Sequence, residues 1–283
     1  MKWLSYFLLL LVSQFFGAAI GSYSSTKHSI GQELHFSEKF FGNYLDDSGI
    51  VDMISMFARL ISSFYTLVIT SKKINQIYFY SIVIQTGSMI LLASSHFFQD
   101  ISVILFVVGM FGFGLGRGVY SFPYLLLSQF FNQPEDICAV NVWFGLGNGG
   151  NLYAFLMYIW FTTSYGMHWT VIIIIVAIIY FCLTFLTYKF VPEVEIQNEQ
   201  VSVCEGIWAN WAILKEHYRR QVSNVLFCID FSFQENLLLI FLFWAPYYFM
   251  KEGFGEKAAL IGICYPAGSL IGSLVLIPAV SLC

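Results

Sequence analysis

Long apolar runs constrain this chain more than any other feature. Residues Val171 to Ile179 carry no polar side chain, and they lie within one of several apolar stretches long enough to cross a bilayer as a helix. A helix satisfies its own backbone hydrogen bonds and needs roughly 20 such residues to span the hydrocarbon core. Eight stretches qualify: Trp3–Ser22, Ile50–Thr70, Tyr78–Ser95, Ile101–Phe131, Ala139–Thr163, Trp169–Tyr188, Val222–Met250 and Ala258–Leu282. The sequence therefore predicts an all-α, multi-pass integral membrane protein.

Composition excludes several other classes of protein. Of the 283 residues, 58% are hydrophobic and only 11% are charged, whereas soluble domains carry about 25% charged residues. A soluble core cannot hide this much apolar surface, so we expect the lipid bilayer to be a partner of the chain. The net charge of −4 provides no basic surface for nucleic acid, which we do not expect as a partner.

Residue types that commonly bind metals or catalyse reactions are scattered. The six cysteines contain no CxxC pair and no spacing typical of metal ligands. The five histidines lie in predicted loops or at span ends, and no two of them share a span at i, i+4 spacing. We therefore expect no metal, no cofactor and no enzymatic activity, and these patterns do not favour an intramembrane enzyme.

One long charged connector divides the predicted spans into two groups. It predicts a six-helix bundle over residues 1–191, a linker over 192–221 and two helices of a second bundle over 222–283. Within the linker, Trp208–Tyr218 fits either a short amphipathic helix on the membrane surface or a solvated segment. The other long connector is predicted at Tyr23–Gly49, directly after the first span.

Basic residues predict the orientation of the spans. Seven Lys and Arg lie on one side and four on the other, and the richer side is usually cytoplasmic. The richer set is Lys2, Lys72, Lys73, Lys189, Lys215, Arg219 and Arg220, and the other is Lys27, Lys39, Lys251 and Lys257. We therefore expect the N-terminus and the 192–221 linker in the cytoplasm. The first stretch also fits a secretory signal peptide, with Lys2 before the apolar run and small residues at Gly17–Ser22.

Charged side chains inside membrane spans are costly and normally face a polar cavity or a partner. The third and sixth predicted spans hold none, so we expect these two helices to face lipid. The second, fourth and seventh are predicted to line a cavity, because they hold Asp52, Arg59, Arg117, Asp230 and Glu235.

Each of these charges has more than one interpretation. Asp52 lies near a span end and fits either a helix cap or a cavity residue. Arg59 lies about two and a half turns into its span, which favours a cavity over snorkelling to the interface. Arg117 lies within Gly112–Gly118, where alternate glycines allow helix backbones to approach closely. Glu235 fits a protonated carboxyl, a partner of an arginine or a member of a proton relay.

Four local motifs, in chain order, resemble those of a known transporter family. They are Gly49-Ile-Val-Asp52 with Met56-Phe57, Trp143 with Gly150-Asn151, Phe241-Leu-Phe-Trp-Ala-Pro-Tyr-Tyr248, and Gly268-Ser-Leu-Ile-Gly272. The chain thereby resembles the major facilitator superfamily, and within it the organophosphate:phosphate antiporter branch that includes sugar-phosphate exchangers. This resemblance implies a complete six-helix N-terminal half and the first two helices of a second half.

The resemblance also implies a function. We expect a secondary transporter that moves a small organic solute by alternating access, with an organophosphate, a sugar phosphate or another organic anion as the candidate. The candidate binding residues are the cations Lys27, Arg59 and Arg117, the coupling or pairing carboxylate Glu235, and the cavity residues Trp143, Asn151 and Trp244.

The chain departs from the pattern of that family at several places. Thr26 stands where the branch has an arginine beside Lys27, and Glu235 stands where it has a cation. Ser71-Lys72-Lys73 keeps only the basic charge of a gating element. The superfamily has twelve helices, whereas eight are predicted here. The alternative hypothesis is therefore a truncated, non-transporting membrane protein that acts as a partner or a sensor.

Overall fold

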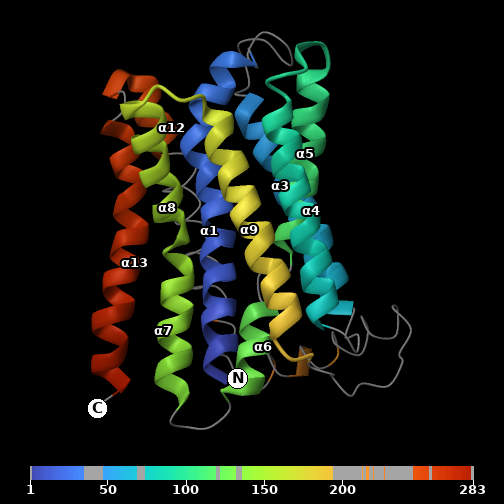
Figure 1. The fold of residues 1–283 in the computed structure, drawn as a ribbon, viewed down its shortest axis with the longest axis vertical. Coiled ribbons are helices and arrows are strands. Elements are labelled where there is room, and N and C mark those ends of the chain that lie inside the picture. The colour runs from blue at the N-terminus through green and yellow to red at the C-terminus, as the bar shows by residue number, and fades with distance from the viewer. Residues whose placement is uncertain are drawn as a thin grey trace.

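Every described element of the protein is helical. The computed structural model describes residues 2–34, 47–68, 74–118, 122–131, 136–193, 212, 215–216, 219, 226, 245–254 and 257–281. The helices lie roughly side by side along one long axis, and the two chain ends lie at the same end of the bundle (Figure 1). No strand occurs among the described residues, which confirms the all-α expectation for this part of the chain.

The described elements follow the predicted spans in order. They are α1 (Lys2–Glu33), α3 (Asp47–Val68), α4 (Ile74–Ser94), η2 (Gln99–Ile101), α5 (Ser102–Arg117), α6 (Phe122–Phe130), α7 (Ile137–Asn148), α8 (Gly150–Met157), η4 (Tyr158–Ser164), α9 (Trp169–Phe190), α12 (Ala245–Phe249), η6 (Met250–Phe254) and α13 (Lys257–Ser281). Among the described residues, four helices are long and apolar enough to cross a membrane: Lys2–Glu33, Ile74–Ser94, Gln99–Arg117 and Trp169–Phe190. They correspond to the first, third, fourth and sixth predicted spans.

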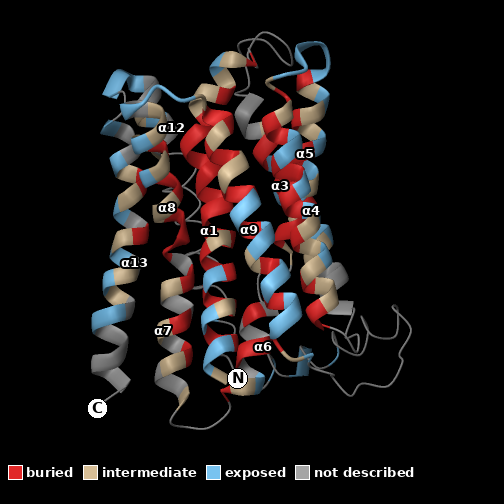
Figure 2. Ribbon diagram, viewed as in Figure 1, coloured by how far each residue is buried: buried red, intermediate tan, exposed pale blue. Residues whose placement is uncertain are grey.

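The first helix, α1, is longer than predicted and occupies the middle of the bundle. The expectation of a connector from Tyr23 is wrong, because α1 continues without a break to Glu33. Polar side chains in this part bond back to their own helix, as when Thr26 Oγ1 donates to the Ser22 carbonyl at 2.7 Å. Such bonds remove the cost of burying the hydroxyls, and this half of α1 is buried in Figure 2.

Two predicted spans are divided into shorter pieces. Within the predicted span Ile101–Phe131, α5 ends at Arg117 with a turn at Gly118 and α6 covers Phe122–Phe130, while residues 119–121 lie outside the described part of the chain. Pro123 lies in the first turn of α6, where its missing N–H costs nothing. The predicted span Ala139–Thr163 is helical but is built from α7, α8 and the π-helical η4 placed end to end.

Alternate glycines allow α5 to pack between two neighbours. Gly112 and Gly116, one turn apart, face α4, where an added Cβ would meet the Ser88 side chain and, at Gly116, both the Gln85 side chain and the Ser81 carbonyl oxygen. Gly114 and Gly118 point the opposite way and face α3. A Cβ on Gly114 would lie 2.1 Å from the carbonyl oxygen of Ser55, which is closer than atoms can approach. The close approach expected from this glycine run is therefore confirmed, with one pair of glycines for each neighbour.

Glycines also allow close contacts between α1 and α8 and between α13 and α8. A Cβ on Gly150 would lie 1.7 Å from the Gln14 carbonyl oxygen of α1. Gly262 of α13 packs against the ring of Phe155 in α8, at 2.3 Å for an added Cβ. In contrast, Gly268 has no atom within 4 Å of an added Cβ. Gly150 and Gly262 therefore lie at close helix contacts, whereas Gly268 does not.

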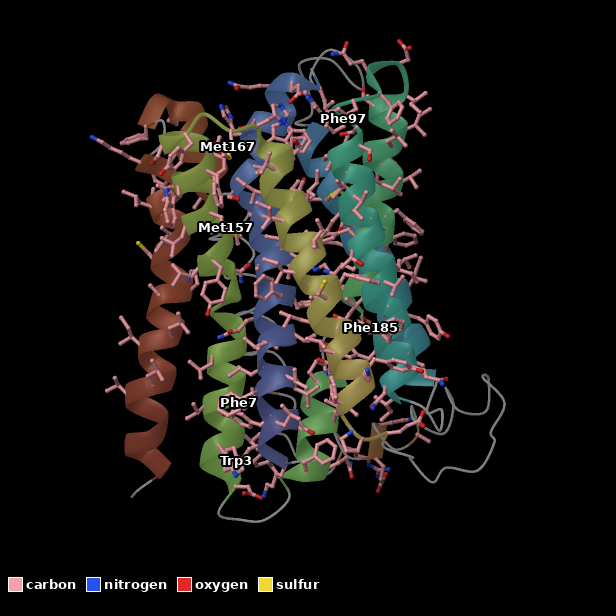
Figure 3. All side chains as sticks on the ribbon, in the orientation of Figure 1. Trp3, Phe7, Phe97, Met157, Met167 and Phe185 are labelled. Carbon is pink, nitrogen blue, oxygen red and sulfur yellow. The ribbon has the colours of Figure 1, made fainter. Side chains whose placement is uncertain are left out.

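The outer surface of the bundle is largely apolar. Figure 3 labels Trp3 and Phe7 near one end, Phe97 near the other and Phe185 between them, and all four side chains are exposed. A soluble protein rarely leaves so many large apolar groups in water. An exposed apolar surface of this kind is compatible with contact with lipid.

Two matched substitutions test the packing of α5. Gly114→Ala is expected to lower the free energy of unfolding by about 1–3 kcal/mol, because the new methyl group meets the backbone of α3. Gly87→Ala in α4 meets no atom within 4 Å, so it should leave stability unchanged or raise it by about 0.5–1 kcal/mol through helix propensity. Thermal unfolding in detergent measures both, and equal effects of the two would contradict the close packing.

Candidate functional site

A buried ion pair joins α1 to α3. Lys27 Nζ lies 2.6 Å from Asp52 Oδ2, and the two side chains are only 2% and 8% exposed. The hydroxyl of Tyr23 donates to the other carboxylate oxygen, Oδ1 of Asp52, at 2.9 Å. Both oxygens of the carboxylate are therefore occupied by donors from α1.

Helix geometry explains how these three groups meet. Tyr23 and Lys27 are one turn apart, so they project from the same face of α1. Asp52 lies inside α3, which begins at Asp47. The interpretation of Asp52 as a helix cap is therefore wrong, since its carboxylate pairs with Lys27 instead of with the backbone of its own first turn.

A second cation lies beside this pair. Arg117 is 5% exposed and shares a small pocket with Asp52, the acidic member of the pair; this pocket is lined by Tyr23, Asp52, Ser55, Met56, Met110, Phe113 and Arg117. Its guanidinium lies over the Phe113 ring, with Cζ 5.9 Å from the ring centroid. Arg117 is the last residue of α5, where the partial negative charge of a helix C-terminus favours a cation.

The cluster combines charged and apolar groups. Lys27 and Arg117 supply two basic side chains, and Asp52 supplies one acidic side chain that contacts Lys27. Met56, Met110 and Phe113 are apolar residues of the pocket lining. Electrostatic interactions are stronger in a buried site than in water.

The structure brings together only some of the predicted site residues. Lys27 pairs with Asp52, and Arg117 lies beside them, so two of the three predicted cations lie close together. Arg59 is half-buried on α3 and does not line this pocket. Two further predicted residues, Glu235 and Trp244, lie outside the described residues, so their roles stay predictions.

Trp143 and Asn151 lie elsewhere in the bundle. Both are buried, on α7 and α8 respectively. The backbone of Asn151 packs against α1 at Gly21, where an added Cβ would lie 2.9 Å from the Asn151 carbonyl oxygen. Gly21 precedes Lys27 by more than one turn of α1. Neither residue lines the pocket beside Lys27, so the prediction of one common cavity for all of them is not supported by these positions.

Sequence reasoning missed two features of the polar interior. Tyr23 was expected in a loop, although its spacing of four residues from Lys27 would have placed both on one face of a longer helix. The Tyr180 hydroxyl donates to Oε1 of Gln85 at 3.3 Å, and both side chains are fully buried. No charge marks that second pair, so a search for charged residues within spans did not find it.

The chain matches no protein-family model and no curated protein. The geometry of the pocket is therefore the basis for assigning a function.

Replacing one member of the ion pair is expected to destabilise the protein. Asp52→Asn removes the carboxylate charge that lies 2.6 Å from the buried Lys27 ammonium group, which should cost about 3–5 kcal/mol of unfolding free energy. Replacing both partners, with Lys27→Met and Asp52→Leu, should cost much less than this single change. Chemical unfolding in detergent measures both values.

The matched control for this experiment is a second ion pair of the same length. Lys2 Nζ lies 2.6 Å from Asp136 Oδ2, but the Lys2 side chain is 41% exposed. Asp136→Asn should therefore change stability by less than about 1 kcal/mol. If Asp52→Asn and Asp136→Asn gave the same small effect, the Lys27–Asp52 pair would not be a buried, unsolvated contact.

Proposed function

We propose that this protein is a secondary transporter of the major facilitator type, embedded in a bilayer with its N-terminus and its 192–221 linker in the cytoplasm. Its solute is a small organic anion, with an organophosphate or a sugar phosphate as the leading class. It moves this solute by alternating access and catalyses no covalent reaction.

The observation that carries this proposal is the buried charge cluster of Lys27, Asp52 and Arg117. Apolar residues of similar size would hold helices together at least as well as a buried ion pair. Charges inside helices of this length mark solute or ion pathways in membrane proteins. The cluster lies between α1, α3 and α5, so a solute there would contact three separate helices.

The chemistry of the cluster favours an anion. In the structure, Asp52 takes the place that an anionic solute would take at Lys27. A phosphate group brings two negative charges at neutral pH and can accept the fork of N–H donors that Arg117 carries. When the solute binds Lys27 and Arg117, Asp52 releases the lysine and keeps its hydrogen bond from Tyr23.

Breaks in the helices support a mechanism that requires movement. The end of α5 coincides with Arg117, and α7 meets α8 at Gly149. Transporters commonly place broken helices at the solute site, since ends of helices provide dipoles and points of bending. Because the break at Arg117 adjoins the pocket, binding of a solute there can be coupled to a change in the angle between α5 and α6.

An uptake assay tests the proposal. The purified protein, reconstituted in liposomes loaded with inorganic phosphate, should exchange internal phosphate for external radiolabelled sugar phosphate. Arg117→Ala should lower this exchange at least tenfold, because the guanidinium no longer contacts the anion, whereas Arg117→Lys should retain part of it. Lys189→Ala, at an exposed position near the end of α9, is the matched control and should leave exchange unchanged.

Two outcomes would contradict the proposal. Exchange by Arg117→Ala at the rate of the unmodified protein would remove the pocket from the transport path. Absence of exchange by the unmodified protein, with a library of organic anions as well as phosphates, would favour the non-transporting partner or sensor. Size-exclusion profiles of Arg117→Ala and Arg117→Lys show whether a loss of exchange reflects misfolding.

A further inference from the structure

A cluster of side chains lies at the end of the bundle opposite the N-terminus. Glu33 ends α1, His96 lies in the turn after α4, and His168 directly precedes α9. Figure 3 labels Phe97 and Met167, the chain neighbours of the two histidines, at this same end. Three segments that are distant in the sequence thus contribute one side chain each to a single point.

The Glu33 carboxylate lies between the two imidazoles. Its Oε1 contacts Nδ1 of His96, and its Oε2 lies 3.0 Å from Nε2 of His168. The two imidazole rings lie beside each other, with their centroids 3.9 Å apart. One possible ligand atom from each of the three residues lies within 4.8 Å of the others. Two nitrogen ligands and one oxygen ligand therefore converge.

We propose that Glu33, His96 and His168 bind a divalent transition metal ion, specifically Zn²⁺. Two imidazoles and one carboxylate are a known zinc ligand set, with bonds of about 2.0–2.2 Å and a fourth position for water. Tetrahedral ligands at that bond length lie about 3.3 Å apart. The observed separations, 3.0 Å in one pair and no more than 4.8 Å in any, reach that value with small side-chain shifts. Imidazole ligands disfavour Mg²⁺ and Ca²⁺, which prefer oxygen.

Neighbouring groups hold these ligands in position. The indole N–H of Trp169 donates to Oε2 of Glu33 at 2.5 Å, which fixes the carboxylate. Nδ1 of His168 lies 3.1 Å from Oγ1 of Thr170. In the structure Nδ1 also accepts a hydrogen bond from the Thr170 backbone N–H at 3.4 Å. With a metal on Nε2, Nδ1 would instead carry the proton and donate to the Thr170 hydroxyl, in exchange for that backbone bond.

The cluster is open to an ion from the water phase. The side chains of Glu33, His96 and His168 are 28%, 31% and 38% exposed, so none of them is sealed inside the bundle. A bound ion would tie the end of α1 to the turn after α4 and to the segment before α9. This inference is independent of the transport proposal, because it concerns ion binding alone. It also departs from the expectation of no metal, which considered only ligands close together in the sequence.

Metal titration of the purified full chain tests the inference. After treatment with a chelator, the protein should bind one equivalent of Zn²⁺ in a calorimetric titration, and Co²⁺ should give the visible absorption of a tetrahedral site. His96→Phe and His168→Phe keep a ring in each place but remove a ligand, so each should weaken binding at least tenfold. Thr170→Val keeps all three ligands and should weaken it about tenfold through loss of orientation. His28→Phe, on α1 outside the cluster, is the control and should bind normally.

Two results would overturn the inference. One is failure of the unmodified protein to bind Zn²⁺ or Co²⁺ above the level of His168→Phe. The other is binding by His96→Phe and His168→Phe as tight as that of His28→Phe. Circular dichroism and size exclusion check that each variant is folded. If a Phe variant is not folded, Glu33→Gln decides, because its amide oxygen can still accept the Trp169 hydrogen bond while the anionic ligand is lost.

Discussion

The ion pair between Lys27 and Asp52 is the contact on which the polar half of this bundle depends. The serine and threonine hydroxyls of α1 from Ser22 to Thr26 donate to carbonyl groups of their own helix, but the buried ammonium group of Lys27 bonds to a side chain of another helix. Asp52 provides this side chain from α3, and Tyr23 occupies its second oxygen. The pair and the Tyr23 hydrogen bond therefore link α3 to α1 through side chains.

The position of α3 in turn determines where the second cation lies. Gly114 brings the backbone of α5 against Ser55, one turn after Asp52, and this close approach leaves no room for sliding. Three residues further along α5, Arg117 consequently lies beside the ion pair. The glycine run is thus more than a packing motif, because it sets the distance between the charges that the proposed transport function requires.

The sequence was informative where one local property decided the outcome. The nine apolar residues from Val171 to Ile179 lie in α9, as expected, since hydrophobicity over a long run leaves a helix as the favoured structure. The end of α1 was predicted wrongly at Ser22, because a run of Ser and Thr resembles a connector when its hydrogen bonds are not known. Charge within spans identified Arg117 and Asp52 as notable, but it could not say that Asp52 pairs with Lys27.

By itself the sequence determined that this protein is helical and largely apolar, and it determined which residues carry charge in apolar surroundings. Only the tertiary structure decided which of these groups meet. Lys27 and Asp52 come from separate helices, and Glu33, His96 and His168 come from three separate segments. The physical reason is range: helix formation depends on neighbours within a few residues, whereas an ion pair or a ligand set depends on how whole helices pack.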